Sequence, residues 1–149
     1  MLLEAELSQL VLVDYQTRLM PAIFEAPLVL ANAMRLAQAA QLMQVPVWGT
    51  EQNPSKLGEN PPELRTLPKH LQKPSNTPTE RSSIVIAGCE AHVCLMQTAL
   101  HLLEDEFEVW VVTDACSSRT ERNRDAAFDR LAGAGAELVT TEMVMFEWL

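Results

Sequence analysis

Residues 83–94, SIVIAGCEAHVC, are the stretch of sequence that decides the fold. The first six are apolar or small, are rich in β-branched side chains and are too few for a helix, so they predict a strand buried on both faces. From Cys94 to residue 105 the apolar side chains recur at the three- and four-residue spacing of an amphipathic helix. A buried strand that leads into a helix is the repeating unit of parallel α/β sheets.

The rest of the chain repeats this alternation of short apolar runs and amphipathic segments. Further strands are predicted at 9–14, 45–50, 107–113 and 137–140, and helices at 27–44, 122–132 and 142–148. Residues 51–81 are instead rich in Pro, Asn, Ser, Lys and Thr, which predicts an irregular segment that carries specificity. The sequence predicts one domain, 1–149, with a doubly wound α/β fold: a mainly parallel sheet with helices on both faces, a Rossmann-like three-layer sandwich.

The balance of charges narrows the class of partner. The chain of 149 residues carries a formal net charge of -9, and its Lys and Arg residues form no run. A nucleic-acid surface needs clustered positive charge, so we expect no nucleic-acid partner and favour a small-molecule substrate. The N-terminus is acidic and no apolar run approaches the roughly 20 residues that span a bilayer, so we expect no export and no membrane partner.

The cysteines and histidines indicate neither a disulfide framework nor a metal site. Three cysteines, Cys89, Cys94 and Cys116, are an odd number without metal-type pairing, which favours a reducing, cytoplasmic compartment. The three histidines lack ligand spacing, and no glycine-rich phosphate loop is present. We therefore expect no metal and no cofactor.

Polar side chains follow several of the predicted strands and are expected to meet at one edge of the sheet. Asp14, Thr50 and Asp114 end strands, and Cys94 begins the helix after residues 83–88. A helix N-terminus stabilises a thiolate and lowers its pKa, which would make Cys94 a nucleophile. Its alternative interpretation is an inert, buried thiol, as we expect for the other two cysteines. Asp14 is a candidate base, or a residue that only ends its strand; His92 competes as base but is better interpreted as structural or substrate-contacting.

Four segments carry a resemblance to a known family: residues 12–16 (LVDYQ), 50–54 (TEQNP), 88–94 (GCEAHVC) and 113–119 (TDACSSR). With them, nearly the whole chain resembles the isochorismatase-like cysteine hydrolases, especially the small subgroup of isochorismatase-domain proteins of unassigned substrate. The thiol segment and the DACSSR segment together make the resemblance specific.

The resemblance implies a role for individual residues. Cys94 is the implied nucleophile and Asp14 the base that takes its proton. The implied oxyanion hole consists of the backbone N–H groups of Cys94 and Glu90, with a cis peptide bond between Cys89 and Glu90. The family also uses a lysine, and Lys73 matches its segment best.

The lysine segment is where the sequence departs from the family. Roughly ten to fifteen residues are missing between 67 and 83, about the length of a small helix with its loop, so Lys69 and the absence of a catalytic lysine are the alternatives to Lys73. The Asp-x-His metal motif of nicotinamidases is replaced by Glu51-Gln52-Asn53. Because a thiol is retained, the resemblance implies cleavage of an amide or carbamoyl C–N bond.

Two other functions and one mode of assembly are compatible with the sequence. A family member that has lost its lysine would act as a binding or scaffold protein. A redox-sensing Cys94, resolved by Cys89 or Cys116, is a weaker alternative. Residues 143–149, MVMFEWL, are unusually apolar for a chain end, and because relatives are commonly oligomeric we expect a homo-oligomer.

Overall fold

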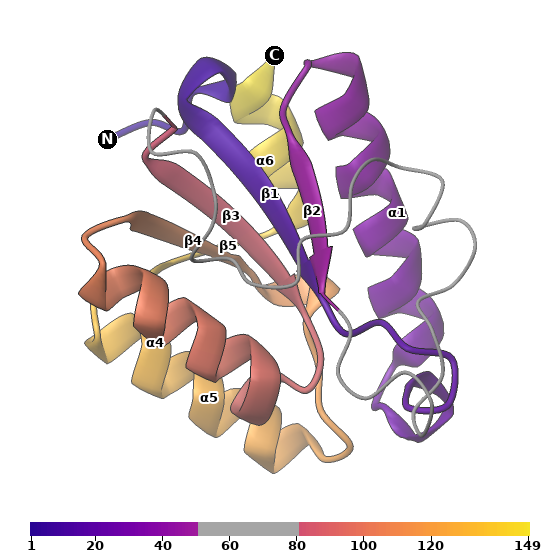
Figure 1. Ribbon diagram of the computed structural model, residues 1–149. Helices are drawn as coiled ribbons and strands as arrows, with labels where there is room; N and C mark the ends of the chain where they lie inside the picture. The colour runs from indigo at the N-terminus through magenta and orange to yellow at the C-terminus, as the bar shows by residue number, and fades with distance from the viewer. Residues whose placement is uncertain (51–80) are drawn as a thin grey trace.

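The computed structural model describes residues 1–50 and 81–149, and its centre is a five-stranded sheet of order β2-β1-β3-β4-β5 (Figure 1). The strands are β1 (Ser8–Val13), β2 (Val47–Thr50), β3 (Ser83–Gly88), β4 (Glu108–Val112) and β5 (Glu137–Val139). Each neighbouring pair is parallel. The predicted α/β class with a parallel sheet is confirmed, and each strand bound lies within two residues of its prediction.

Helices cover both faces of this sheet, which confirms the three layers. The α-helices are α1 (Ala26–Leu42), α4 (Met96–Glu104), α5 (Glu121–Gly133) and α6 (Thr141–Trp148). The first and last contact each other on one face, while α4 and α5 contact each other on the opposite face (Figure 1). Short 3-10 turns, η1 (Ala5–Leu7), η2 (Met20–Ala22) and η5 (Thr113–Ala115), connect the larger elements.

The helix that was predicted to begin at Cys94 begins differently. Residues Ala91–Leu95 form a π-helical turn, η4, and regular α-helix starts only at Met96. The carbonyl of Glu90 accepts hydrogen bonds from Val93 N at 3.0 Å and from Leu95 N at 3.3 Å, and the second of these is the five-residue bond of a π-turn. Cys94 therefore lies inside a widened turn before α4, not at the first position of an α-helix.

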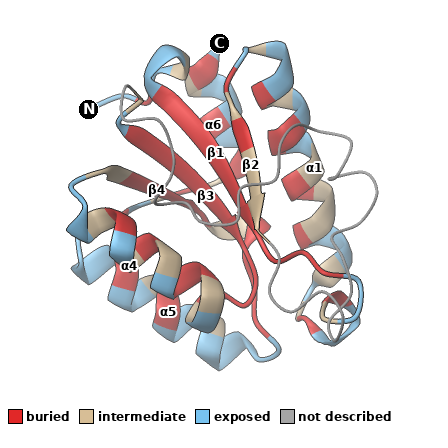
Figure 2. Ribbon diagram, viewed as in Figure 1, coloured by how far each residue is buried: buried red, intermediate tan, exposed pale blue. Residues whose placement is uncertain are grey.

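The strands β1 and β3 are buried along their whole length. Every residue of β1 and β3 is buried, and Figure 2 shows them as continuous buried bands through the middle of the molecule. Leu10, Val11, Ile84 and Ile86 are fully buried. Burying such side chains contributes about 1.5–3 kcal/mol each, so these strands form a rigid base for whatever follows them.

The direction of the strand order reverses between β1 and β3, and we refer to the carboxyl edge of the sheet at this point as the crevice. From β1 the chain moves outward to β2 through α1 on one face, whereas from β3 it moves the other way, to β4 and β5, through helices on the opposite face. Such a reversal is the point where doubly wound sheets bind ligands, outside the carboxyl ends of the strands. Asp14 follows β1 and residues 89–95 follow β3 at this point.

Gly88 allows the two central strands to approach each other closely at this edge. Its φ is +153°, and a Cβ built on it would lie 2.2 Å from the carbonyl oxygen of Val13. Only glycine fits such an approach without moving β1.

Some predictions fall on residues 51–80, which lie outside the described part of the chain. They include the irregular segment and both candidate lysines, Lys69 and Lys73. Among the helices of the described residues, none is both long and apolar enough to cross a membrane.

Candidate active site

Asp14 lies at the carboxyl end of β1 in a position that the backbone fixes. Its φ is +51°, an uncommon conformation for a residue with a side chain, and its N–H donates to the carbonyl of Thr50 at 3.1 Å. The Thr50 hydroxyl donates to Asp14 Oδ1 at 3.1 Å, and only 4% of Asp14 is exposed. The carboxylate is thus held in the crevice by both neighbouring strand ends.

Cys94 faces this carboxylate from the turn that follows β3. Its side chain is half-buried, and the thiol is hydrogen-bonded to Asp14. Burial, this hydrogen bond and the negative charges of Asp14 and Glu90 together raise the pKa of the Cys94 thiol to about 12. The sequence analysis predicted a lowered pKa for Cys94, because it considered the helix N-terminus and not the carboxylates that the folded chain brings close to the thiol. At rest Cys94 is a neutral thiol beside a carboxylate.

The turn that carries Cys94 has the backbone that the resemblance implied. The peptide bond between Cys89 and Glu90 is cis. Cys89 N donates to the carbonyl of Val13 at 3.0 Å, which continues the contact between β1 and β3 past the end of the strand. Glu90 and Cys94, whose N–H groups are the implied oxyanion donors, therefore belong to one compact turn at the crevice.

A second segment, residues 117–119, braces this turn, and sequence reasoning missed it. Ala91 N donates to the carbonyl of Ser117 at 2.8 Å, and Cys89 pairs with Ser117 in an isolated parallel bridge. Glu90 Oε2 accepts from Arg119 N at 3.0 Å and from Arg119 Nε at 3.1 Å. The DACSSR motif was the available signal, although it named the family without saying what the residues touch.

His92, the competing candidate for the base, is engaged elsewhere. Its Nδ1 lies 2.8 Å from Ser118 Oγ, so it ties the turn to the bracing segment. The hydrogen bond of the thiol goes to Asp14. Geometry thus favours Asp14 as the proton acceptor for Cys94 and a structural contact for His92.

Asp114 and Cys116, which follow β4, are used differently from Asp14 and Cys94. Asp114 Oδ1 accepts from both the N–H and the hydroxyl of Thr141 at 2.8 Å, so it fixes the start of α6. Its carbonyl accepts from Asn32 Nδ2 at 2.8 Å, which adds α1 to the same junction. Cys116 is 1% exposed, and burial raises its pKa above the ordinary value. These residues hold helices together.

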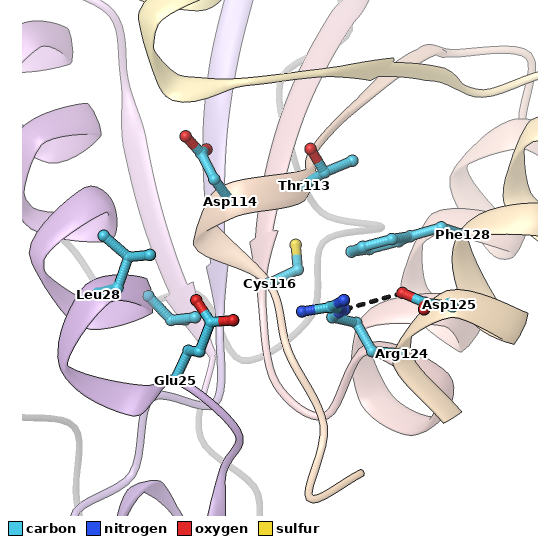
Figure 3. A pocket seen from close by; sticks show the side chains of 9 residues that line it. Glu25, Leu28, Thr113, Asp114, Cys116, Arg124, Asp125 and Phe128 are labelled. Atoms are coloured by element: carbon cyan, nitrogen blue, oxygen red, sulfur yellow. Dashed lines mark hydrogen bonds and ion pairs between the residues drawn. The ribbon is translucent and has the colours of Figure 1, made fainter. Parts of the chain in front are cut away.

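A cavity of about 420 Å³ lies beside this junction (Figure 3). It opens between the first turns of α1 and α5, and its lining includes Cys116 and the ion pair of Arg124 and Asp125. Asp14, Glu90 and Cys94 do not line it. The cavity is therefore separate from the site of Asp14 and Cys94.

Metal ligation finds no support among the described residues. Over 1–50 and 81–149, no group of three His, Cys, Asp or Glu side chains is arranged to hold a metal ion.

The fold and the crevice define a class: doubly wound α/β proteins with a thiol and a carboxylate paired at the switch point of the sheet. The isochorismatase domain model matches residues 77–143. Isochorismatase domain-containing protein 2 of Xenopus laevis is 36% identical over 155 residues, which cover 95% of this chain and 76% of the relative. The chain belongs to the isochorismatase domain family.

Solved structures with similar sequences have the same fold as this chain. The MAR1 ribonuclease from Caenorhabditis elegans has a TM-score of 0.92 at 32% identity, covering 99% of this chain and 83% of that one. YcaC from Escherichia coli, described as an octameric hydrolase of unknown specificity, has a TM-score of 0.90 at 28% identity, covering 99% and 81%. Family membership supports a hydrolase.

Proposed function

We propose that this chain, acting as a single domain over residues 1–149, is a cysteine-dependent hydrolase that cleaves an amide or carbamoyl C–N bond of a small molecule. One observation carries the proposal: the Cys94 thiol is hydrogen-bonded to the Asp14 carboxylate at the β1/β3 switch point. A nucleophile paired with a base in a ligand-binding crevice is the arrangement that covalent catalysis needs.

The pKa of the thiol determines how the first step must proceed. Because the pKa of the thiol is raised well above neutral pH, most Cys94 is protonated at rest, and the first step has to remove that proton. Asp14 therefore takes the proton as Sγ attacks the carbonyl carbon. The backbone N–H groups of Cys94 and Glu90 receive the developing oxyanion.

The remaining steps return the site to its starting state. The tetrahedral intermediate collapses, the C–N bond breaks, and Asp14 gives its proton to the leaving nitrogen, which leaves a thioester on Cys94. Water then attacks the thioester while Asp14 takes one of its protons. The C–S bond breaks, the acid is released, and the proton returns to the Cys94 sulfur.

Lys73 is the proposed third member, with Lys69 as the alternative. An ammonium near the pair would stabilise both the carboxylate and the developing thiolate and so oppose the charges that raise the pKa of the thiol. Separate Lys73→Met and Lys69→Met variants identify the one that acts, because only that one loses turnover.

Turnover of a panel of small amides and carbamoyl compounds tests the proposal. We expect hydrolysis by the purified chain that falls at least about 10³-fold in Cys94→Ala, with a substrate-derived adduct on Cys94 found by mass spectrometry. Cys116→Ala is the matched control, since it removes a thiol outside the crevice. Hydrolysis that survives Cys94→Ala would overturn the proposal.

The alternative is a binding or scaffold protein that keeps the fold without turnover. The observation in its favour is that Cys94 rests as a neutral thiol. Calorimetric binding of a panel member that is never hydrolysed, with equal affinity in Cys94→Ala, would favour this alternative.

Nucleic acid remains an unfavoured partner in this proposal. One structural relative is named a ribonuclease, but the net charge of -9 here opposes contact with a phosphate backbone. RNA cleavage that is lost in Cys94→Ala would overturn this preference.

Self-association and a cytoplasmic location complete the proposal. The relative from Escherichia coli is described as octameric, and in this chain Phe146 and Leu149 are 76% and 89% exposed at the end of α6. Apolar exposure of this kind is common at subunit contacts. Light scattering should show an oligomer that Phe146→Glu weakens. Cys89, Cys94 and Cys116 are free thiols, the form that a reducing cytoplasm maintains.

A further inference from the structure

The side chain of Glu90 is a buried charge whose position the hydrolase proposal leaves unexplained. It is 9% exposed, and only its backbone N–H has a proposed role. A neutral Gln at this position could accept the same hydrogen bonds from Arg119. A carboxylate costs more to bury than an amide and repels a thiolate on Cys94, so its presence calls for a physical reason.

The contacts of Glu90 connect the nucleophile turn to residue 119. One oxygen, Oε2, accepts from both the backbone N–H and the Nε of Arg119. The Glu90 side chain is 11% exposed, whereas that of Arg119 is 61% exposed, so the ion pair joins the inside of the crevice to its surface. The same turn is braced by Ala91 N on the carbonyl of Ser117 and by the contact of His92 with Ser118.

We propose that Glu90 and Arg119 form a positioning pair, which fixes the turn that presents Cys94 and sets the charge felt by its sulfur. The inference rests on the proposed function and adds to it. Neither side chain bonds with the substrate in this role. Glu90 keeps the nucleophile protonated until substrate arrives, and Arg119 limits this effect by partly neutralising Glu90.

The charges around the sulfur give the two members opposite effects. Within the described residues, the carboxylates that raise the pKa of Cys94 are Asp14, from the end of β1, and Glu90, from the same turn. Cys89 is buried with its own pKa raised to about 12 by burial, so it stays neutral. The described cation that contacts Glu90 is Arg119. Removing Glu90's charge should therefore favour the thiolate, and removing Arg119's charge should oppose it.

The test is the rate at which iodoacetamide alkylates Cys94 between pH 8 and 10, followed at the Cys94 peptide by mass spectrometry. In this range, below the thiol pKa, the rate at fixed pH follows the thiolate fraction. We expect Glu90→Gln to raise the rate about 3- to 10-fold and Arg119→Gln to lower it about 3-fold, a smaller change because Arg119 is largely solvated. Arg119→Lys, which keeps the charge, should stay close to the wild-type rate.

Matched controls separate this effect from general changes of surface charge. Glu104→Gln and Arg122→Gln alter exposed residues of α4 and α5 and should leave the profile unchanged. A structural role alone would make both members change the rate in the same direction through loosening of the turn. An alkylation rate that changes in the same direction in Glu90→Gln and Arg119→Gln, or that changes in neither, would overturn the proposal.

Alkylation does not depend on turnover, so the two proposals fail separately. Opposite changes in the alkylation rate, in a chain that hydrolyses nothing, would support the positioning pair and reject the hydrolase proposal. Cys94-dependent hydrolysis with unchanged alkylation would reject the positioning pair and retain the hydrolase. If Arg119→Gln does not fold, the comparison of Glu90→Gln with wild type decides the matter.

Discussion

The carboxyl edge of the sheet holds two pairs of the same residue types, and the molecule uses them differently. Asp14 and Cys94 meet across the β1/β3 crevice, where the thiol is hydrogen-bonded to the carboxylate. Asp114 and Cys116 follow β4, where the carboxylate fixes α6 and the thiol is buried. Residue type and strand-end position are common to both. Only Asp14 and Cys94 lie at the β1/β3 switch point, which is where we propose that the reaction takes place.

The largest difference should come from the two cysteines. Cys94→Ala should lower hydrolysis by at least about 10³-fold, whereas Cys116→Ala should leave turnover per folded molecule unchanged. Removing the buried Cys116 sulfur instead leaves a small cavity and costs about 1 kcal/mol of stability. Steady-state kinetics measure the loss of turnover and urea unfolding measures the loss of stability in the same two variants. A loss of turnover in Cys116→Ala together with full turnover in Cys94→Ala would contradict the difference between the two pairs.

The two aspartates should likewise differ, one in turnover and the other in stability, with a smaller loss of activity than for Cys94. Asp14→Asn removes the base and should lower turnover about 10²- to 10⁴-fold while the fold is retained. Asp114→Ala removes an acceptor for Thr141 and should cost about 1–2 kcal/mol with turnover per folded molecule preserved. Equal kinetic losses in both variants would show that Asp14 has no special chemical role.

Glycine substitutions should distinguish the crevice from the end of helix α5. Gly88→Ala forces a Cβ against the Val13 carbonyl and should cost at least about 2 kcal/mol. Gly133→Ala meets nothing within 4 Å at the end of α5 and should be neutral or stabilising by up to about 1 kcal/mol. Unfolding midpoints in urea measure both, and similar costs would mean that β1 and β3 are not held in close contact.

Alkaline pH should sharpen the contrast between the two thiols. Unfolded thiols lose their protons near pH 9, whereas burial raises the folded pKa of Cys94 to about 12 and that of Cys116 still further. The folded state therefore holds more protons between these values, and the stability that the thiols contribute below pH 9 is lost as pH rises through the window. Each fully buried thiol steepens that loss by about 1.4 kcal/mol per pH unit.

Urea unfolding from pH 8 to 10.5 measures this slope. Cys116→Ala should reduce it by nearly the full amount for one thiol. Cys94→Ala should reduce it less, because the half-buried Cys94 is partly screened by solvent. A larger reduction in Cys94→Ala than in Cys116→Ala would contradict the assigned burial of the two sulfurs.

The sequence was sufficient to predict the strands, the class of fold and the edge of the sheet that Asp14 and residues 89–94 share. Buried parallel strands have a recognisable composition, and their carboxyl ends necessarily share one edge. The predicted direction of the Cys94 pKa shift was wrong, because the shift depends on burial and on charges that distant segments bring near the thiol. The π-turn also escaped prediction, since a five-residue hydrogen bond at one carbonyl leaves no periodic pattern.

The role of residues 113–119 shows a different limit of sequence reasoning. Asp114 acts on Thr141, and Arg119 on Glu90, each across more than twenty-five residues of chain. No local rule connects partners at such separations, so the motif indicated a family without revealing that one part fixes a helix and the other braces the nucleophile turn. Lys73 stays a prediction, as it lies outside the described residues.

The most direct test of the central claim is the mass of the Cys94 peptide after the chain is mixed with a hydrolysed amide and quenched in acid. We expect an acyl adduct on Cys94 that is absent in Cys94→Ala, strongly reduced in Asp14→Asn and unchanged in Cys116→Ala. Hydrolysis without any adduct and with full activity in Cys94→Ala, or an adduct on Cys116, would contradict it.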